Sequence, residues 1–316
     1  MKAKFMIMIA AAAMTLAACS NDDESDNWAG EIRLSSGLTV LQTGTRAATG
    51  IQSTQFASGE KIDVFISENT TGTATTTYAQ PLVYTAGGSG TMNPPADNQP
   101  YFPTSGNGVN IYAYYPSEKV TDITATNVSF SVAEDQSGET NYKASDLMYG
   151  TPASNPVART GSAIALTFNH LLSKVTITLE SGAGSPGLDG AVVKLKAVKP
   201  STTLNPSTGA ISEAGGDAKN ITVMTASGTA LSGSAVVVPQ TLETSFIEVT
   251  LANGGVLTSK DLKDSGGNTI SNVELTGGNE YTYTITVNLT ELKVTSTIAE
   301  WKGINANKIT GTATMN

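Results

Sequence analysis

The sequence predicts an all-β protein built of two antiparallel β-sandwiches in series. Apolar and polar residues alternate with a period of two along the chain, which is typical of strands that bury one face and leave the other in water. Clusters rich in Gly, Asn, Pro and Ser separate these stretches and predict tight connections. With 316 residues, the chain is long enough for two domains of ordinary size.

Six stretches carry the alternation most clearly. They are "KIDVFIS" at 61–67, "VNIYAYYP" at 109–116, "NVSFSVA" at 127–133, "SKVTITLE" at 173–180, "FIEVTLAN" at 246–253 and "EYTYTITVNL" at 280–289. The last of them places the apolar residues from Tyr281 to Leu289 on one face. We expect the junction between the sandwiches near residue 169, because one set of strands ends there and a new set begins.

The N-terminal end of the chain predicts export and lipid attachment. An apolar run that follows Lys2 and Lys4 is too short to span a membrane and has the charge and length of a secretory signal peptide. It ends in "LAAC" at 16–19, which resembles the bacterial lipobox, in which the cysteine carries diacylglycerol. Cys19 is the only cysteine of the sequence, as expected for an acylated thiol. The alternative is a buried cysteine at the end of an ordinary signal peptide.

The composition is acidic and weakly charged. The formal net charge of −9 argues against a nucleic-acid partner or an anionic membrane surface. Only 14% of the residues are charged, while Thr, Ser and Gly are abundant, as expected for an extracellular β-protein with many turns.

Residues that could support catalysis are few. His170 is the only histidine, and we expect it to be a hydrogen-bonded structural residue at the domain junction. Two acidic pairs, Glu134 with Asp135 and Asp261 with Asp264, lie in polar, loop-like contexts where solvated charge is the usual state. We therefore expect no enzyme, no metal site and no cofactor.

Five longer stretches follow one another in a distinctive order. They are "FASGEKIDVFIS" at 56–67, "NIYAYYP" at 110–116, "DLMYG" at 146–150, "LTFNHLLSKVTITL" at 166–179 and "YTYTITVNLTELKVTSTIAEW" at 281–301. With these stretches and the lipobox, the chain resembles the fimbrillin family of Bacteroidetes, the two-domain lipoprotein pilins of type V pili. The resemblance implies two transthyretin-like β-sandwiches and a surface lipoprotein of the outer membrane.

The resemblance also implies an assembly mechanism. In the family, an arginine-specific surface protease cuts behind the first strand, and loss of that strand opens an apolar groove that a segment of the next subunit fills. Here the strand is "EIRLSSGLTVLQ" at 31–42, whose inward residues are Ile32, Leu34, Leu38 and Val40. We expect a β-bulge at Gly37.

The cut is expected between Arg46 and Ala47. The sequence holds three arginines, and only a cut after Arg46 removes one strand and leaves both domains complete. Arg33 lies within the strand, and Arg159 lies in another loop-like stretch. The alternative for Arg46 is an ordinary loop cation.

The segment that fills the groove is expected from the C-terminus. The candidates are "LKVTSTIAEWKG" at 292–303 and the tail "INANKITGTATMN" at 304–316. The alternative is that Val294, Ile298 and Trp301 close the second sandwich and that the tail frays.

These expectations divide the chain into five segments. They are a signal peptide at 1–18, an acidic flexible tether at 19–30, the first strand and cleavable linker at 31–46, an N-terminal sandwich at 47–168 and a C-terminal sandwich at 169–316. We expect a structural or adhesive subunit of a surface fimbria. Its partners are other pilin subunits, the arginine-specific protease and the membrane, through the lipid on Cys19.

An alternative function keeps the same fold without polymerisation. The protein would then be a surface lipoprotein that binds a host glycan or host protein. Tyr112, Tyr114 and Tyr149 could stack on sugars, although packing against neighbouring strands is the commoner role of strand tyrosines.

Overall fold

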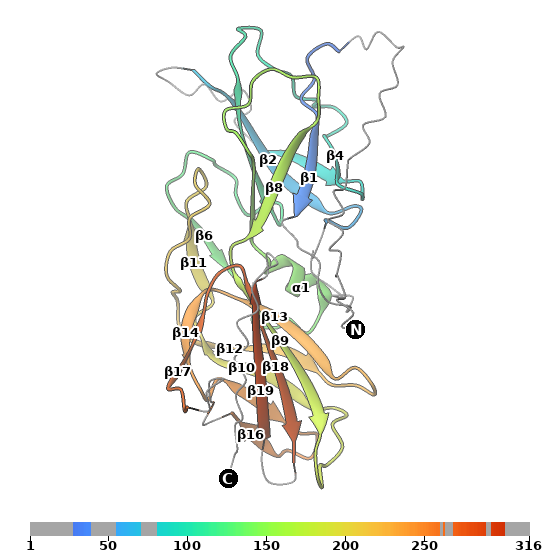
Figure 1. The fold of residues 1–316 in the computed structure, drawn as a ribbon, viewed down its shortest axis with the longest axis vertical. Coiled ribbons are helices and arrows are strands. Elements are labelled where there is room, and N and C mark those ends of the chain that lie inside the picture. Colours follow the sequence, from blue (N-terminus) through green and yellow to red (C-terminus); the bar gives the residue numbers. More distant parts are fainter. Residues whose placement is uncertain are drawn as a thin grey trace, which may run out of the picture.

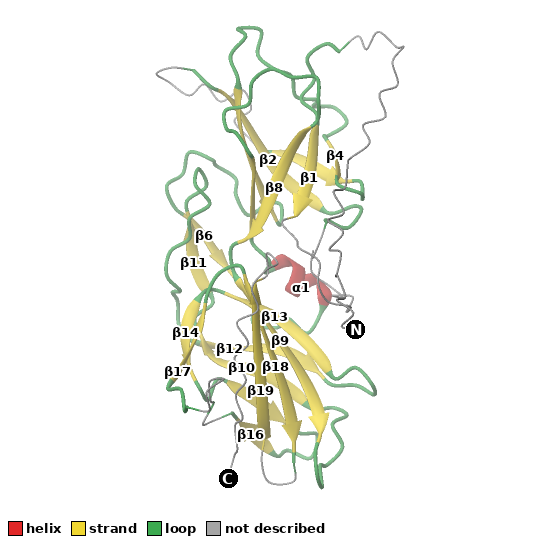
Figure 2. Cartoon of the chain, viewed as in Figure 1, coloured by secondary structure: helices red, strands yellow, loops and turns green. Residues whose placement is uncertain are grey.

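The computed structural model of the protein describes residues 28–38, 55–70, 81–259, 262, 268–288 and 292–300. These residues form nineteen strands and one short helix (Figure 2). The strands gather in two units that follow one another along the long axis of the molecule (Figure 1). The prediction of an all-β protein is confirmed.

The first unit is a closed β-barrel. Its strands are β1 (Leu34–Leu38), β2 (Lys61–Glu68), β3 (Leu82–Ala86), β4 (Thr91–Asn93), β5 (Val109–Tyr115), β7 (Met148–Pro152) and β8 (Ile164–His170). Around the barrel they follow the order β1-β4-β3-β2-β5-β7-β8, so β1 closes the ring between β4 and β8. Neighbouring strands are antiparallel, except that β1 and β8 run parallel. Alternate side chains fill the interior, as Ile62, Val64 and Ile66 of β2 show.

The second unit consists of two four-stranded sheets around a common core. One sheet has the order β13-β9-β18-β19, and its strands are β9 (Ser173–Ser181), β13 (Ser232–Val237), β18 (Asn279–Val287) and β19 (Leu292–Glu300). The other has the order β12-β10-β15-β16, and its strands are β10 (Val192–Val198), β12 (Lys219–Thr225), β15 (Ile247–Thr250) and β16 (Val256–Thr258). Buried residues of both sheets, such as Ile177, Ile285, Leu195 and Val249, belong to one cluster. In this unit β9 and β18 are parallel.

A segment before β7 joins the second unit. It contains β6 (Val128–Ser131), which pairs with β11 (Ser201–Leu204), and the helix α1 (Glu139–Ala144). Phe130 and Leu147 are buried in the core of the second unit, and the Gln136 side chain exchanges two hydrogen bonds of 2.8 Å with the backbone of Val236. A further small sheet pairs β14 (Gln240–Glu243) with β17 (Asn272–Leu275). The second unit thus includes residues that precede the expected junction, because alternation does not say which core a strand joins.

The only histidine of the sequence lies at the end of β8. Its Nδ1 is 2.7 Å from Oδ1 of Asp146, and both side chains are buried. The expectation of a hydrogen-bonded structural histidine is confirmed.

Tyrosines of the barrel contact the second unit. The rings of Tyr112 and Tyr149 stack with their centroids 6.5 Å apart, and Tyr114 lies 5.4 Å from Tyr149. The Tyr114 hydroxyl donates a hydrogen bond to the carbonyl oxygen of Pro206, in the loop after β11. In the same loop, a Cβ on Gly209 would overlap the Tyr149 ring. Tyr114 and Tyr149 therefore pack within the protein, as strand tyrosines commonly do.

We expect Gly209→Ala to destabilise the protein more than Gly106→Ala. Both glycines have a positive φ, +71° and +84°, so both substitutions strain the backbone by about 1–2 kcal/mol. Only at Gly209 does a ring occupy the space of the new Cβ, and such overpacking adds about 1–3 kcal/mol. Melting temperatures of the two variants measure the difference, and equal values would contradict the proposed contact.

Candidate functional site

The first strand is the candidate functional site, because it alone closes the barrel between β4 and β8. Its ladder with β8 is parallel and covers five residues, starting at Leu34 opposite Ile164. Its antiparallel ladder with β4 covers two residues. Without β1, both neighbours would present an unpaired edge.

The side chains of the first strand alternate as predicted. Ile32 and Leu34 are 1% and 5% exposed, and Leu38 is partly buried against the same core. The strand therefore fills part of the barrel interior as well as its wall.

The expected bulge at Gly37 is wrong. The register of β1 against β8 runs without a break from Leu34 to Leu38. The inward residues all have even numbers, so a regular strand already places them on one face. Val40, the last of the expected inward residues, lies outside the described residues.

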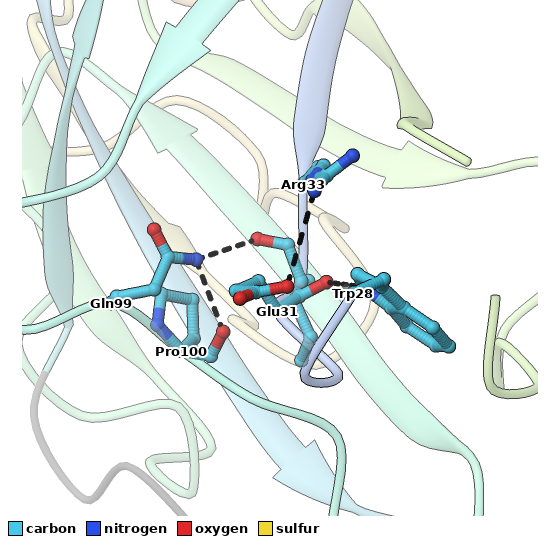
Figure 3. A network of polar contacts seen from close by, with 6 residues as sticks. Trp28, Glu31, Arg33, Gln99 and Pro100 are labelled. Atoms are coloured by element: carbon cyan, nitrogen blue, oxygen red, sulfur yellow. Dashed lines mark hydrogen bonds and ion pairs between the residues drawn. The ribbon is translucent and has the colours of Figure 1, made fainter. Parts of the chain in front are cut away.

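The loop that contains Gln99 and Pro100 forms hydrogen bonds with the residues at the start of the strand (Figure 3). The Gln99 side-chain amide donates hydrogen bonds to the carbonyl oxygens of Ile32, at 3.2 Å, and of Pro100, at 3.1 Å. The Ile32 N–H donates to the Pro100 carbonyl oxygen at 2.8 Å. Beside them, Glu31 and Arg33 form an ion pair of 4.0 Å. Both backbone polar groups of Ile32 are thus bound to the same loop.

Trp28 packs against the barrel ahead of the strand. Its indole N–H donates a hydrogen bond of 3.0 Å to the carbonyl oxygen of Glu31 (Figure 3). The Trp28 and Phe102 rings pack edge to face, with their centroids 6.3 Å apart. The guanidinium carbon of Arg159 lies 4.7 Å from the centroid of the Trp28 ring, in a cation–π contact. Trp28 and Gly30, expected to belong to a flexible tether, therefore pack against the barrel. Sequence reasoning missed Trp28, although a tryptophan directly before a strand was a signal.

Three residues expected to carry processing lie outside the described residues. They are Cys19, Arg46 and Ala47. The other two arginines are described, and both are engaged at the first strand, Arg33 with Glu31 and Arg159 with Trp28. Lipidation and cleavage stay predictions.

The candidate donor segment lies in the second unit. β19 pairs with β18 over nine residues and forms the edge of its sheet. Val294 is fully buried there. Within this single chain β19 thus belongs to the second unit, as the alternative expected of Val294. Residues 301–316, which include the tail, lie outside the described residues.

The acidic pairs do not form a site in the part of the chain that the structure describes. Glu134 lies 3.6 Å from Lys219, and Asp135 accepts hydrogen bonds within its own turn. Asp261 and Asp264 lie outside the described residues.

Neither a metal-ligand cluster nor a membrane-spanning helix is present in the described ranges. There, no group of three or more histidine, cysteine or acidic residues could hold a metal ion. The helix of that part of the chain is too short to cross a membrane.

One buried carboxyl group of the barrel has a perturbed pKa. Asp63 of β2 is fully buried, and its Oδ2 accepts a hydrogen bond of 2.6 Å from the Glu118 N–H. Its Oδ1 has no hydrogen-bond partner among the described residues. Burial raises the pKa of Asp63 to about 6, against the lowering effect of the Glu118 N–H.

The fold and the first strand define a class of protein. It is an all-β chain of two units, in which the N-terminal strand closes the first unit as a barrel. The model of a family described as fimbrillin-like matches residues 45–301. The chain therefore belongs to the fimbrillin-like family and is a fimbrial or adhesion-type surface protein. The resemblance to fimbrillins is confirmed.

Solved structures share the fold. One is a candidate cell adhesion protein from Bacteroides uniformis, with 20% identity and a TM-score of 0.65 over 86% of this chain and 98% of that chain. Another, from Bacteroides ovatus, has 16% identity and a TM-score of 0.65 over 86% of this chain and 97% of that chain. At these identities the likeness concerns the fold alone. No curated protein matches the chain.

We expect Asp63 to make the stability of the protein fall as the pH rises from about 4 to about 6. Its pKa is 3.8 when unfolded and about 6 when folded, so the folded protein binds more protons in this range. The contribution of Asp63 is fully present below the lower value and is lost above the higher one. Urea unfolding at several pH values measures this fall.

The variant Asp63→Asn should remove this fall. Asp97→Asn, which changes an exposed carboxylate of the same unit, is the matched control and should retain it. An unchanged pH dependence in Asp63→Asn would contradict the assignment.

Proposed function

We propose that this protein is a structural or adhesive subunit of a surface fimbria, exported as an outer-membrane lipoprotein and polymerised by removal of its first strand and donor-strand exchange. The observation that carries the proposal is the place of β1 in the barrel. This strand, which has a neighbour on each side, belongs to the segment that precedes Arg46. A cut after Arg46 separates β1 from the remaining chain and leaves every other described strand intact.

Removal of β1 would create a surface that a lone subunit cannot keep exposed. It would bare the facing edges of β4 and β8 and the space that Ile32 and Leu34 fill. Burying two aliphatic side chains there again is worth about 3–6 kcal/mol before ordering costs. An extended segment with the same alternation is the natural occupant, because it restores both ladders and the core.

The sequence of β19 resembles that of β1. The stretches "EIRLSSGL" at 31–38 and "ELKVTSTI" at 291–298 share their Glu and one Ser, and only Gly37 and Thr297 differ in character. The aliphatic residues correspond in order, with Leu292, Val294 and Ile298 in place of Ile32, Leu34 and Leu38. This likeness supports β19 of a second copy as the occupant of the empty groove.

The exchange would change the number of paired residues little. β19 leaves a one-sided ladder of nine residues with β18. The groove offers five partners on β8 and two on β4. Backbone hydrogen bonding is thus nearly balanced. Filling the barrel core favours the exchange, and the departure of Val294 from the second core opposes it.

Export and anchoring belong to the same proposal. The lipobox and the single Cys19 support attachment of a lipid to this residue, and family membership supports association with other pilin subunits. The remaining partner is an arginine-specific surface protease that acts at Arg46.

Cleavage of the exported protein by an arginine-specific protease is expected to give a new N-terminus at Ala47 and oligomers that resist sodium dodecyl sulfate. N-terminal sequencing and unheated denaturing gels measure the two outcomes. Arg46→Lys keeps the charge and removes the cleavage site, so it should stay monomeric. Cleaved wild-type protein that remains monomeric would contradict polymerisation and favour a surface lipoprotein that binds a host glycan or protein.

A disulfide can test the register of exchange. If Leu292 of one subunit takes the place of Ile32 in the next, Thr297 replaces Gly37, which lies opposite Thr167 of β8. Paired strands bring Cα atoms close enough for a disulfide. We expect the double variant Thr167→Cys, Thr297→Cys to form a disulfide between subunits after cleavage, visible on non-reducing gels.

The matched control moves one cysteine by a single residue. Neighbouring residues of a strand point to opposite faces, so Thr167→Cys with Ser296→Cys should not cross-link. In the uncut chain, Thr297 pairs with Thr282 of β18 in the second unit, whereas Thr167 lies on β8 of the barrel. Equal cross-linking by both pairs, or cross-linking before cleavage, would rule out this register.

A further inference from the structure

The two ends of the first strand are held unequally. At its start, Ile32 and Leu34 are almost fully buried. At its end, Ser36 and Leu38 are only partly buried and Gly37 is exposed. The contacts of the strand with the barrel core are therefore concentrated toward its N-terminal end.

The residues ahead of the strand add a second set of contacts. The Trp28 ring lies between Phe102 and the Arg159 guanidinium. Gly30 has a φ of +104°, and a Cβ there would lie 2.6 Å from Nη2 of Arg159, so only glycine fits this turn. The Gly30 carbonyl oxygen also accepts a hydrogen bond of 2.9 Å from the Phe102 N–H. Gly161 also lies close to the Trp28 ring, because a Cβ built on it would be 3.4 Å from the nearest ring atom.

We propose that these five residues, Trp28, Gly30, Phe102, Arg159 and Gly161, form a latch that keeps β1 in the barrel after the chain has been cut behind it. Cleavage and strand release are then separate steps. The barrel stays closed in the cut subunit, and its apolar interior stays covered until another strand arrives.

The latch also gives strand release a direction. After a cut, the new chain end is on the Leu38 side of β1, where Ser36, Gly37 and Leu38 are less buried than Ile32 and Leu34, so β1 frays from that end first. An incoming strand can pair with β8 from the same end while the latch still holds. The contacts of Trp28 are the last to break. The biological role of this order rests on the proposed function, whereas the latch itself rests on the described contacts.

The experiment uses an exported protein in which residues 43–48 are replaced by the recognition sequence of a site-specific protease. This makes the cut independent of whether Arg46 is the natural site. After cleavage, gel filtration and mass spectrometry measure how fast the N-terminal fragment dissociates. We expect wild-type fragment to co-elute with the remaining chain.

Substitution of Trp28 should accelerate the loss of the fragment. Trp28→Ala removes a large, half-buried ring, and we expect dissociation about tenfold to a hundredfold faster. Arg159→Gln removes only the cation–π contact and should make dissociation about twofold to fivefold faster. Tyr101→Ala, which truncates an exposed aromatic residue of the adjacent loop, is the matched control and should leave the rate unchanged.

Hydrogen exchange in the cut protein tests the direction. The Ser36 N–H donates to Gly90 and the Ile32 N–H to Pro100, both at 2.8 Å. We expect the Ser36 amide to lose protection while the Ile32 amide keeps it.

Should Trp28→Ala fail to fold, Trp28→Phe, which keeps a ring in the latch, replaces it in the dissociation experiment and should give a smaller acceleration of fragment loss.

The latch is overturned if the wild-type fragment dissociates at once, if Trp28 variants behave like wild type, or if both amides exchange equally. A retained, Trp28-dependent fragment in a protein that never polymerises would leave the latch standing and defeat the proposed function alone.

Discussion

Closure of the barrel by one short strand is the constraint on which the rest of the first unit depends. A barrel is free of exposed edges only while every strand has two neighbours. β1 supplies both missing neighbours at once, one for β8 and one for the short strand β4. Leu34 of this strand and Ile32, two residues ahead of it, lie in the interior. The strand pairing and the core of the barrel therefore both depend on β1, which is joined through the chain to the other barrel strands only at its C-terminal end.

The second unit does not share this dependence. Its two sheets and their common core contain no residue of β1, so loss of that strand would leave them complete. The tyrosines of β5 and β7 and the loop after β11 still hold the barrel against it. Loss of β1 would therefore leave the arrangement of the second unit unchanged.

Much of the fold was predictable, because a strand with one buried face leaves a period of two in the sequence. The alternation in "EYTYTITVNL" corresponds to β18, and the inward positions of Ile32 and Leu34 were correct. The parallel pairs of β1 with β8 and of β9 with β18 were not predicted, since parallel and antiparallel strands alternate alike. The Trp28 contacts were missed because their partners, Phe102 and Arg159, lie far away in the chain.

The sequence by itself determined the strand content, the faces of the strands, the place of the turns and the resemblance to fimbrillins, since each of these depends on the order of neighbouring residues. Only the tertiary structure decided that β1 is one of the strands that form a closed barrel, that residues before β7 join the second core and that the Arg159 guanidinium lies over the Trp28 ring. Those features depend on which distant strands and loops meet, and a local pattern of apolar and polar residues carries no record of its partner.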